Sequence, residues 1–200
     1  MTLDEIMHEI AKDAHYYKQS GGGVTLSGGE CLLQADFCTS LLERCKNMDF
    51  HTAIESALFV PWENIEKVLP FCDFIYADLK IANSQKHQHY TGQNNNLILE
   101  NLQKLSFTVP GKVTVRIPLI PGVNDASEGI SDFAKFLTPL AENISGIEVL
   151  RYNNLAESKY KQLGKKHTNF GQPQPDDVLQ EICASFEKAL EHKIRVYFVA

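Results

Sequence analysis

Residues 21–30 read Gly-Gly-Gly-Val-Thr-Leu-Ser-Gly-Gly-Glu and hold the change of structure that decides the fold. Their first three glycines end a helical spacing of apolar residues between Leu3 and Tyr17, and the apolar run at 24–26 is typical of a short strand. Two further glycines follow in the loop at 27–30. Because glycine has no Cβ, the backbone of this loop can come close to a ligand and present amide and carbonyl groups to it. A plain tight turn would use the same glycines, so this loop alone leaves both interpretations open.

Outward from this stretch, short apolar runs alternate with helical patterns. We expect helices near 3–17, 37–48, 62–69, 98–105, 130–137 and 178–186, and strands near 24–26, 52–54, 74–77, 113–117, 147–150 and 194–199. Serial strand–helix repeats predict an α/β fold with a mostly parallel (βα) repeat, as an open sheet or a barrel. The chain opens on a helix, whereas a parallel barrel normally opens on a strand. If the fold is a barrel, we therefore expect a piece to be missing at its front.

Composition indicates a globular protein that buries a real core, since 44% of the 200 residues are hydrophobic and 22% are charged. This length suits one domain, and we expect residues 1–200 to form a single truncated one. The net charge of −6 gives no reason to expect nucleic acid or a membrane as partner. No run approaches the roughly 18 apolar residues of a membrane span, and the acidic N-terminus is unlike a secretory signal. We expect a cytoplasmic location.

Five cysteines, at positions 31, 38, 45, 72 and 183, show no paired short spacing. This pattern argues against a disulfide framework and against a zinc site. Cys31, Cys38 and Cys45 recur every seven residues and would share one helix face, but about 10 Å of helical rise separates each from the next. That is too far to share a metal. We expect free thiols buried on a core-facing helix, and no metal site.

Polar or charged residues follow five successive predicted strands. They are 28–30, Glu55, Asp78 with Lys80, Arg116, and Asn153 with Asn154. The carboxyl ends of parallel strands meet at one edge of a sheet or barrel, and ligand sites form there. Any one of these residues is explained equally well as a loop residue in water. Five in succession favour a common polar site.

Five motifs, in order, then make the sequence similar to a known family. They lie at 21–30, 51–55, 78–80, 115–125 and 152–160, so the match covers nearly the whole chain. They resemble the glycyl-radical-enzyme activating enzymes, typified by the pyruvate formate-lyase activating enzyme, within the radical S-adenosylmethionine (SAM) superfamily. The resemblance implies a partial TIM-like barrel of the radical SAM type that is missing its first βα unit.

The resemblance also implies a set of SAM-binding residues, namely Ser27, Gly28, Gly29, Glu30, Glu55, Asp78, Lys80, Arg116 and Asn153. The loop at 27–30 would meet the amino group of the methionine moiety. Glu55, Lys80 and Arg116 would be polar partners of the methionine and ribose portions. The chemistry is reasonable, because a zwitterionic ligand needs carboxylates for its amine and cations for its carboxylate.

Two further positions follow from the same resemblance. Asp78 matches a carboxylate that contacts a cation or cofactor, and Asn153 matches a position near the adenosine. No catalytic residue is assigned. The local sequence departs from the family at Arg151, where relatives usually have proline, and after Glu55, where a glycine often follows.

The largest departure concerns iron. The family holds a [4Fe–4S] cluster with three cysteines spaced Cys-x-x-x-Cys-x-x-Cys, and that spacing does not occur in the sequence. We expect the cluster in a full-length form only, and this chain by itself to be inactive. In the intact enzyme the resemblance implies reductive cleavage of SAM to a 5′-deoxyadenosyl radical, which takes hydrogen from a glycine of a partner glycyl radical enzyme, pyruvate formate-lyase or a relative. Flavodoxin or ferredoxin would supply the electron.

Two alternatives come from other classes of protein. A barrel aldolase could use Lys80 as a Schiff-base lysine, since lysines of lowered pKa attack carbonyl substrates. A non-catalytic module could instead bind a protein partner through its acidic surface. Binding of SAM, or borohydride trapping of a carbonyl substrate, separates these hypotheses.

Overall fold

The computed structural model describes residues 1–153, 155, 157–165 and 168–199. Six strands form one parallel sheet in which chain order is also spatial order. The strands are β1 (Gly23–Leu26), β2 (His51–Ser56), β3 (Phe74–Asp78), β4 (Val113–Pro118), β5 (Gly146–Leu150) and β6 (Val196–Phe198). Within the described part of the chain, β1 and β6 are the two edges, and the sheet is not closed. The predicted partial (βα) barrel is therefore confirmed.

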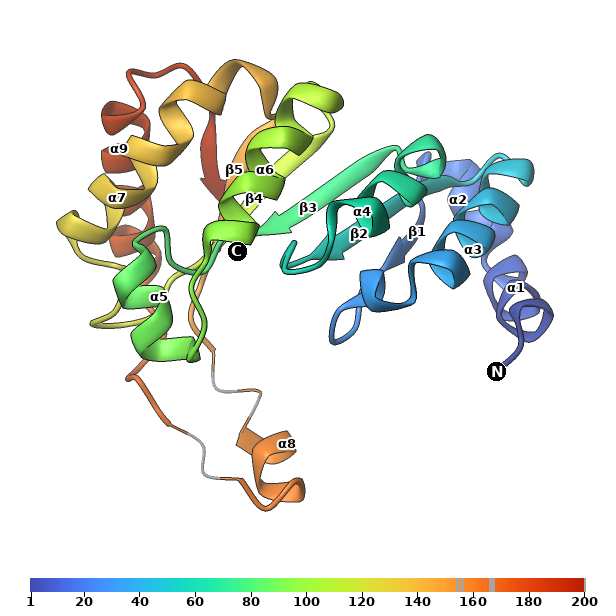
Figure 1. Cartoon of the computed structure of the whole chain (residues 1–200), viewed down its shortest axis with the longest axis horizontal. Coiled ribbons are helices and arrows are strands. Elements are labelled where there is room, and N and C mark those ends of the chain that lie inside the picture. Colours follow the sequence, from blue (N-terminus) through green and yellow to red (C-terminus); the bar gives the residue numbers. More distant parts are fainter. Residues whose placement is uncertain (154, 156, 166–167, 200) are drawn as a thin grey trace. The chain divides into compact units, whose positions relative to one another are not determined.

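Nine α-helices occur in the described ranges (Figure 1). They are α1 (Leu3–Lys12), α2 (Ala14–Ser20), α3 (Ala35–Asn47), α4 (Trp62–Val68), α5 (Ser84–Thr91), α6 (Asn96–Thr108), α7 (Ser127–Leu137), α8 (Glu157–Gln162) and α9 (Asp176–Ala189). The first predicted helix is divided at Asp13. Helices α5 and α8 were not predicted, and α5 buries only His87, so it has no apolar periodicity to detect. None of the described helices is long and apolar enough to span a membrane.

The chain divides into two compact units. The first unit comprises residues 1–78 and 96–114, and the second comprises residues 79–95 and 115–200. The prediction of a single domain stays a prediction, and each unit is described by itself below.

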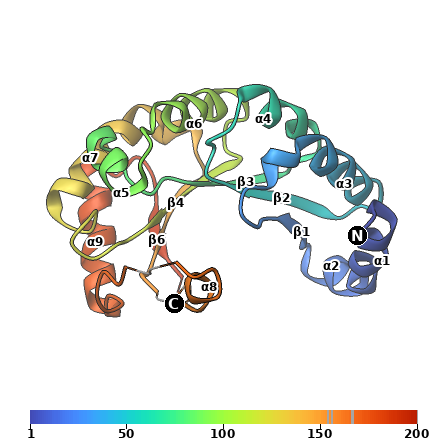
Figure 2. The ribbon, with the colours of Figure 1, turned by 60° about the horizontal axis from the view of Figure 1, so that its bottom comes forward.

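In the first unit, helices α3 and α4 lie on one side of strands β1–β3 (Figure 2). The register pairs Leu26 with Ile54 and Ile54 with Ile75, so the same face of each strand supplies core residues. Helix α1 packs its apolar stripe, which includes Leu3 and Ile10, against a small cluster of buried residues, Leu41, Cys45 and Phe50. The apolar side of this sheet is thus covered, whereas the opposite face carries Glu55 and Asp78 beside the aromatic residues Phe74 and Tyr76.

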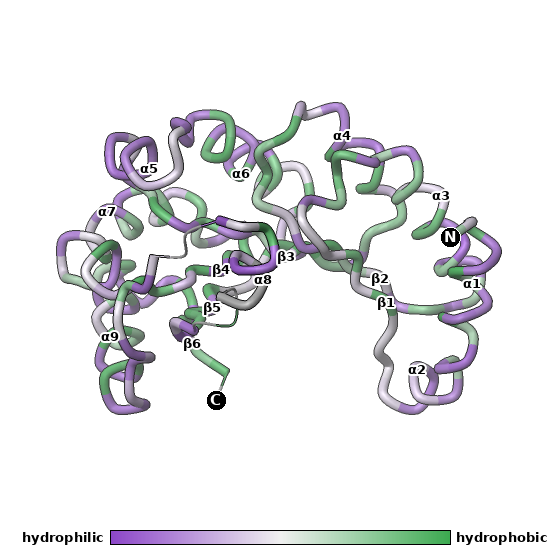
Figure 3. The backbone as a smooth tube through the Cα atoms, turned by 90° about the horizontal axis from the view of Figure 1, so that it is seen from below, coloured by the Kyte–Doolittle hydropathy of each residue, from purple (hydrophilic) through white to green (hydrophobic). Residues whose placement is uncertain are grey.

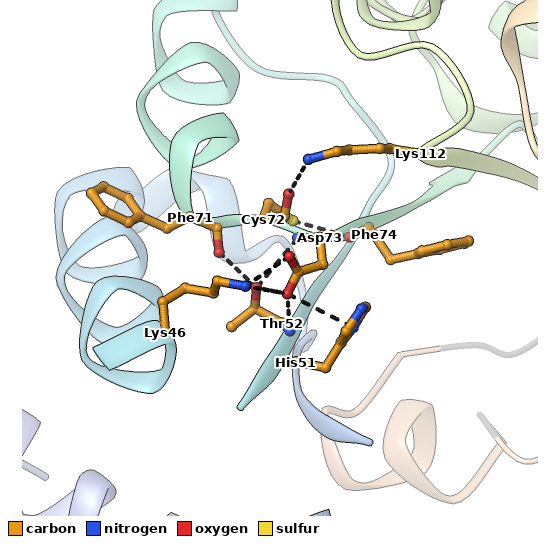
Figure 4. A network of polar contacts seen from close by, with 8 residues as sticks. All are labelled: Lys46, His51, Thr52, Phe71, Cys72, Asp73, Phe74 and Lys112. Carbon is orange, nitrogen blue, oxygen red and sulfur yellow. Dashed lines mark hydrogen bonds and ion pairs between the residues drawn. The ribbon is translucent and has the colours of Figure 1, made fainter. Parts of the chain in front are cut away.

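A polar network fixes the amino ends of β2 and β3 in the first unit (Figure 4). The Asp73 carboxylate accepts hydrogen bonds from Lys46 Nζ at 2.8 and 2.9 Å and from the Thr52 backbone N–H at 2.9 Å. Burial alone raises the pKa of the Asp73 carboxyl, but the hydrogen bonds from Lys46 and Thr52 outweigh it and hold that pKa below its ordinary value. This end of a parallel barrel supports the fold.

In the second unit, helices α7 and α9 lie side by side, and α9 packs on β6 (Figure 1). The rings of Phe133 and Phe186 meet at a centroid distance of 5.8 Å. In Figure 3 the tube of α9 alternates between hydrophilic and hydrophobic colours, as expected for a helix with one buried stripe. The core residues Ile147 and Val149 of β5 are fully buried.

The position of Cys31 differs from the one expected from the sequence. Cys38 and Cys45 are buried in α3 as predicted, but Cys31 lies outside that helix, in a 3₁₀ turn at Cys31–Gln34, and is only half-buried. The backbone at Gln34 is non-helical, with φ −117° and ψ 47°. Because the chain bends there, the Cys38 sulfur lies 3.2 Å from the Cys31 carbonyl oxygen, so the expected separation along a single helix is wrong for this pair.

Candidate functional site

The loop that follows β1 has the backbone freedom that the sequence indicated. Gly28 has a φ of 126°, which side chains with a Cβ rarely adopt, so glycine is required at this position. Gly29 has no such constraint, and a Cβ built there would meet no atom within 4 Å. The protein's own packing therefore does not explain Gly29, whereas close approach of a ligand would.

Glu30 ends this loop and ties it to the carboxyl end of β2. One carboxylate oxygen accepts hydrogen bonds from Ser56 Oγ at 2.9 Å and from the Leu32 backbone N–H at 3.2 Å, and the other accepts from the Ala57 N–H at 2.9 Å. These hydrogen bonds fix the end of the loop against the residues that follow β2. The contact of Glu30 with SAM stays a prediction. Ser56 was missed, because a lone serine at a strand end carries no sequence signal.

Ser27 and Glu55 meet at the same edge. The Ser27 hydroxyl donates to a Glu55 carboxylate oxygen at 3.0 Å. Glu55 lies opposite Tyr76 in the β2–β3 register, so Asp78, two residues further along β3, is on the same face of the sheet. The first unit thus gathers a hydroxyl and two carboxylic side chains at the carboxyl ends of β1–β3, a set suited to an ammonium group.

Arg116, in the second unit, has a partner that the sequence did not indicate. Its Nε lies 2.6 Å from a Glu148 carboxylate oxygen, and the two side chains are only 20% and 9% exposed. Both are therefore largely withdrawn from water, which makes the pair strongly interdependent. The sequence analysis did not identify Glu148; a single acidic residue among the apolar residues of β5 was the only signal that could have indicated it.

Lys80 and Asn153 lie on an open pocket of about 590 Å³ in the second unit. Aromatic rings form much of its wall: Phe170 contacts Tyr90 and Tyr152 edge-on at centroid distances of 6.2 and 6.5 Å. Tyr90 comes from α5 and Phe170 from a loop, so neither was identified from the sequence. Asn154 lies outside the described residues.

Asn124 holds the main chain on one side of this pocket. Its side-chain amide donates to the Lys80 carbonyl at 2.7 Å and the Pro118 carbonyl at 2.8 Å, and its Oδ1 accepts from the Ile120 N–H at 2.7 Å. Asn124 is 2% exposed. Within the motif at 115–125, Asn124 therefore has a structural role, because its buried side chain joins three backbone groups. This role was not predicted from the sequence.

Lys80 does not have the surroundings of a Schiff-base lysine. Its side chain is exposed, whereas a reactive lysine is usually desolvated in an apolar pocket. The aldolase alternative therefore has no support from this site. Among the residues that the structure describes, no three His, Cys, Asp or Glu side chains come together as metal ligands.

Comparison with known families decides between the remaining interpretations. The family model of the radical SAM superfamily matches residues 1–134. The chain belongs to the radical SAM superfamily. This match covers the loop at 27–30, Glu55, Asp78 and Arg116, the positions that the sequence had placed at strand ends.

Curated relatives of this radical SAM chain are activating enzymes. It is 42% identical over 165 residues to the (2S)-3-sulfopropanediol dehydratase activating enzyme of Klebsiella oxytoca, covering 82% of this chain and 52% of the relative. It is 37% identical over 190 residues to the trans-4-hydroxy-L-proline dehydratase activating enzyme of Clostridioides difficile, covering 93% and 62%. The chain thus spans between about half and three fifths of the length of these relatives.

Solved structures agree with the radical SAM assignment. A domain of the pyruvate-formate lyase-activating enzyme from Bacteroides vulgatus matches with a TM-score of 0.72 and 27% identity, over 90% of this chain and 99% of that one. A radical SAM methyltransferase from Sphaerobacter thermophilus shares the fold, with a TM-score of 0.64 and 16% identity over 100% of this chain and 57% of that one. The family resemblance read from the motifs is confirmed.

Proposed function

We propose that this chain is the SAM-binding part of a glycyl-radical-enzyme activating enzyme. The observation that carries the proposal is the pairing of Ser27 with Glu55 beside the open face of Gly29, at the carboxyl end of the first strands. A hydroxyl and a carboxylate beside a glycine loop suit the amino group of a methionine moiety. Glu30 would act here mainly by holding the loop in position.

In the second unit, we propose that the aromatic pocket takes the adenosine portion of SAM. Flat rings such as Tyr152 and Phe170 provide apolar faces for a base, and Asn153 offers an amide for polar contact. Lys80 would approach the carboxylate or the ribose. Arg116, held by its ion pair with Glu148, would be a polar partner of the methionine or ribose portion of SAM.

A [4Fe–4S] cluster does not fit the residues described, because they bring no three suitable ligands together. Reductive cleavage of SAM is therefore assigned to a longer form and not to residues of this chain. What these residues would do is bind SAM, orient it and exclude water from it.

The partner we propose for the longer form is a glycyl radical enzyme, pyruvate formate-lyase or a relative such as a dehydratase. Flavodoxin or ferredoxin would be the electron donor, and the cytoplasm the location. The relatives' names support the class of partner, since each is an activating enzyme for a named enzyme.

Calorimetric titration of the purified chain with SAM tests the site. Glu55→Gln should weaken binding by about tenfold or more, since a charge-assisted hydrogen bond contributes about 1.5–3 kcal/mol. Glu63→Gln, on the exposed side of α4 in the same unit, is the matched control and should bind as the unmodified chain does. Equal loss in both variants, or no effect of Glu55→Gln, would contradict the assignment.

A further inference from the structure

The main chain that carries Lys80 is irregular, since it lies between the end of β3 and the start of α5. The side chains on either side of it, Leu79 and Ile81, are buried, whereas the Lys80 side chain is exposed and lies on the wall of the 590 Å³ pocket. Backbone outside helices and strands has no regular hydrogen-bond partners, so its carbonyl groups need other donors wherever water is excluded.

Two buried asparagines supply such donors. The Asn124 side-chain amide donates to the Lys80 carbonyl at 2.7 Å, and the Asn95 side-chain amide donates to the carbonyls of Ile81 and Ala82 at 2.9 and 2.8 Å. Both asparagine side chains are withdrawn from water. Three successive carbonyl groups are thus held by side chains, which gives the main chain at Lys80 one defined path.

Asn124 also holds the segment that follows β4. It donates to the Pro118 carbonyl at 2.8 Å and accepts from the Ile120 N–H at 2.7 Å. The three residues whose backbone groups it holds, Lys80, Pro118 and Ile120, all line the same pocket, and all belong to the second unit. One buried amide therefore sets the positions of the two segments after β3 and β4 where they form the pocket wall.

We propose that Asn124 is a positioning residue for SAM, acting through Lys80. This inference rests on the proposed function, in which Lys80 approaches the carboxylate or the ribose of SAM. A contact contributes less to affinity when the groups that make it must first be ordered, and the lysine stem is itself flexible. Because Asn124 orders the main chain at Lys80 in advance, SAM binding has only the Lys80 side chain left to order.

Calorimetric titration with SAM of the unmodified chain, Lys80→Met, Asn124→Ala and the double variant tests this coupling. Lys80→Met keeps an unbranched side chain without the charge and should weaken SAM binding by about tenfold. Asn124→Ala should weaken binding by about tenfold alone but by less than about threefold when added to Lys80→Met, because a residue that acts through Lys80 has little effect without it. Circular dichroism must show every variant folded at the temperature used.

Asn101 provides a matched control in the first unit. Its side-chain amide donates to two backbone carbonyls, of Leu58 and Val60, at 2.9 and 2.8 Å, and it is buried to the same degree as Asn124. Asn101→Ala should therefore lower the free energy of unfolding as Asn124→Ala does. Its effect on SAM affinity, whatever its size, should be the same with and without Lys80→Met, so the control separates coupling to Lys80 from general destabilisation.

Hydrogen exchange on the unmodified chain gives a second test that needs no variant. The Ile120 N–H already donates to Asn124, so it should be protected without SAM. Saturating SAM should then raise its protection no more than that of the core residue Val149 in the same unit, because binding raises global stability for all amides alike. A gain at Ile120 that exceeds the gain at Val149 by about tenfold would mean that SAM orders this segment, and would overturn the proposal.

The outcomes distinguish this inference from the proposed function. If Asn124→Ala has equal effects with and without Lys80→Met, or is folded and binds SAM as the unmodified chain does, the positioning role is wrong and the SAM site stands. Unchanged binding in Lys80→Met would likewise overturn this inference alone. Failure of the unmodified chain to bind SAM would overturn the proposed function and this inference together.

Discussion

The Ser27 hydroxyl donates a hydrogen bond of 3.0 Å to a carboxylate oxygen of Glu55, joining the loop after β1 to the end of β2. These residues are 28 positions apart, and a helix separates their strands. Parallel pairing of β1 with β2 is what brings them to the same edge. The chemistry proposed for the first unit depends on this relationship.

The loop is held by Glu30, so its loss should destabilise the fold. Glu30→Ala leaves the N–H groups of Leu32 and Ala57 and the Ser56 hydroxyl without their acceptor, and should lower the free energy of unfolding by about 1–3 kcal/mol. Urea denaturation measures this change. Glu63→Ala, an exposed helix position in the same unit, is the control and should change stability little. Equal stability of the two variants would show that the hydrogen bonds of Glu30 contribute nothing.

The pair of Arg116 and Glu148 should behave as a unit. Arg116→Met leaves the Glu148 carboxylate, 9% exposed, without its cation and should cost about 3–5 kcal/mol. The double variant Arg116→Met with Glu148→Leu should be more stable than Arg116→Met alone, since it removes the unpaired buried charge. A double-mutant cycle, built from the free energies of unfolding in denaturant, gives the coupling energy between Arg116 and Glu148. If the effects of the two single substitutions simply add, the two residues do not act as a pair.

Acid should release the polar network around Asp73. Because its pKa is lowered on folding, its contribution is present above the ordinary carboxyl value near ~3.9 and is lost as pH falls below that value. The difference in the free energy of unfolding between the unmodified chain and Asp73→Asn should therefore be largest above about pH 5 and shrink in stronger acid. Thermal unfolding of both proteins, at pH values above and below about pH 5, measures this difference. If the stability difference between the two proteins instead grows as pH falls, the pKa of Asp73 is not lowered on folding.

Anaerobic reconstitution tests the expectation about iron. Treated with iron and sulfide, the purified chain should not acquire a stoichiometric [4Fe–4S] cluster, because the sequence has no Cys-x-x-x-Cys-x-x-Cys spacing. Absorption spectra and iron analysis provide the measurement. A full complement of cluster would require a new search for ligands, beginning with Cys31 and Cys72.

Periodicity was enough to predict all six strands and the parallel sheet, because each strand carries an apolar run and each is followed by a break. It was not enough for α5, whose residues are polar on nearly every side and whose formation depends on an Asn83 cap. It also failed at Gln34, where one non-helical residue separates Cys31 from the helix that the seven-residue spacing suggested.

The placement of Ser27, Glu55 and Asp78 at the carboxyl ends of β1–β3 was predictable, since alternation and parallel pairing are properties of the sequence pattern. Partners supplied by distant segments were not. Ser56 for Glu30, Glu148 for Arg116, and Phe170 for the pocket all depend on packing that the local sequence does not encode. These three partners could be identified only from the structure.

The measurement that tests the central claim most directly is electron paramagnetic resonance of a glycyl radical enzyme, incubated without oxygen with SAM, a one-electron reductant and the complete protein that contains this chain. The account predicts a glycyl radical signal that requires SAM and that falls by about tenfold or more in Glu55→Gln but not in Glu63→Gln, in line with the loss of a charge-assisted bond. A SAM-dependent product without any glycyl radical, or a signal indifferent to Glu55, would contradict it.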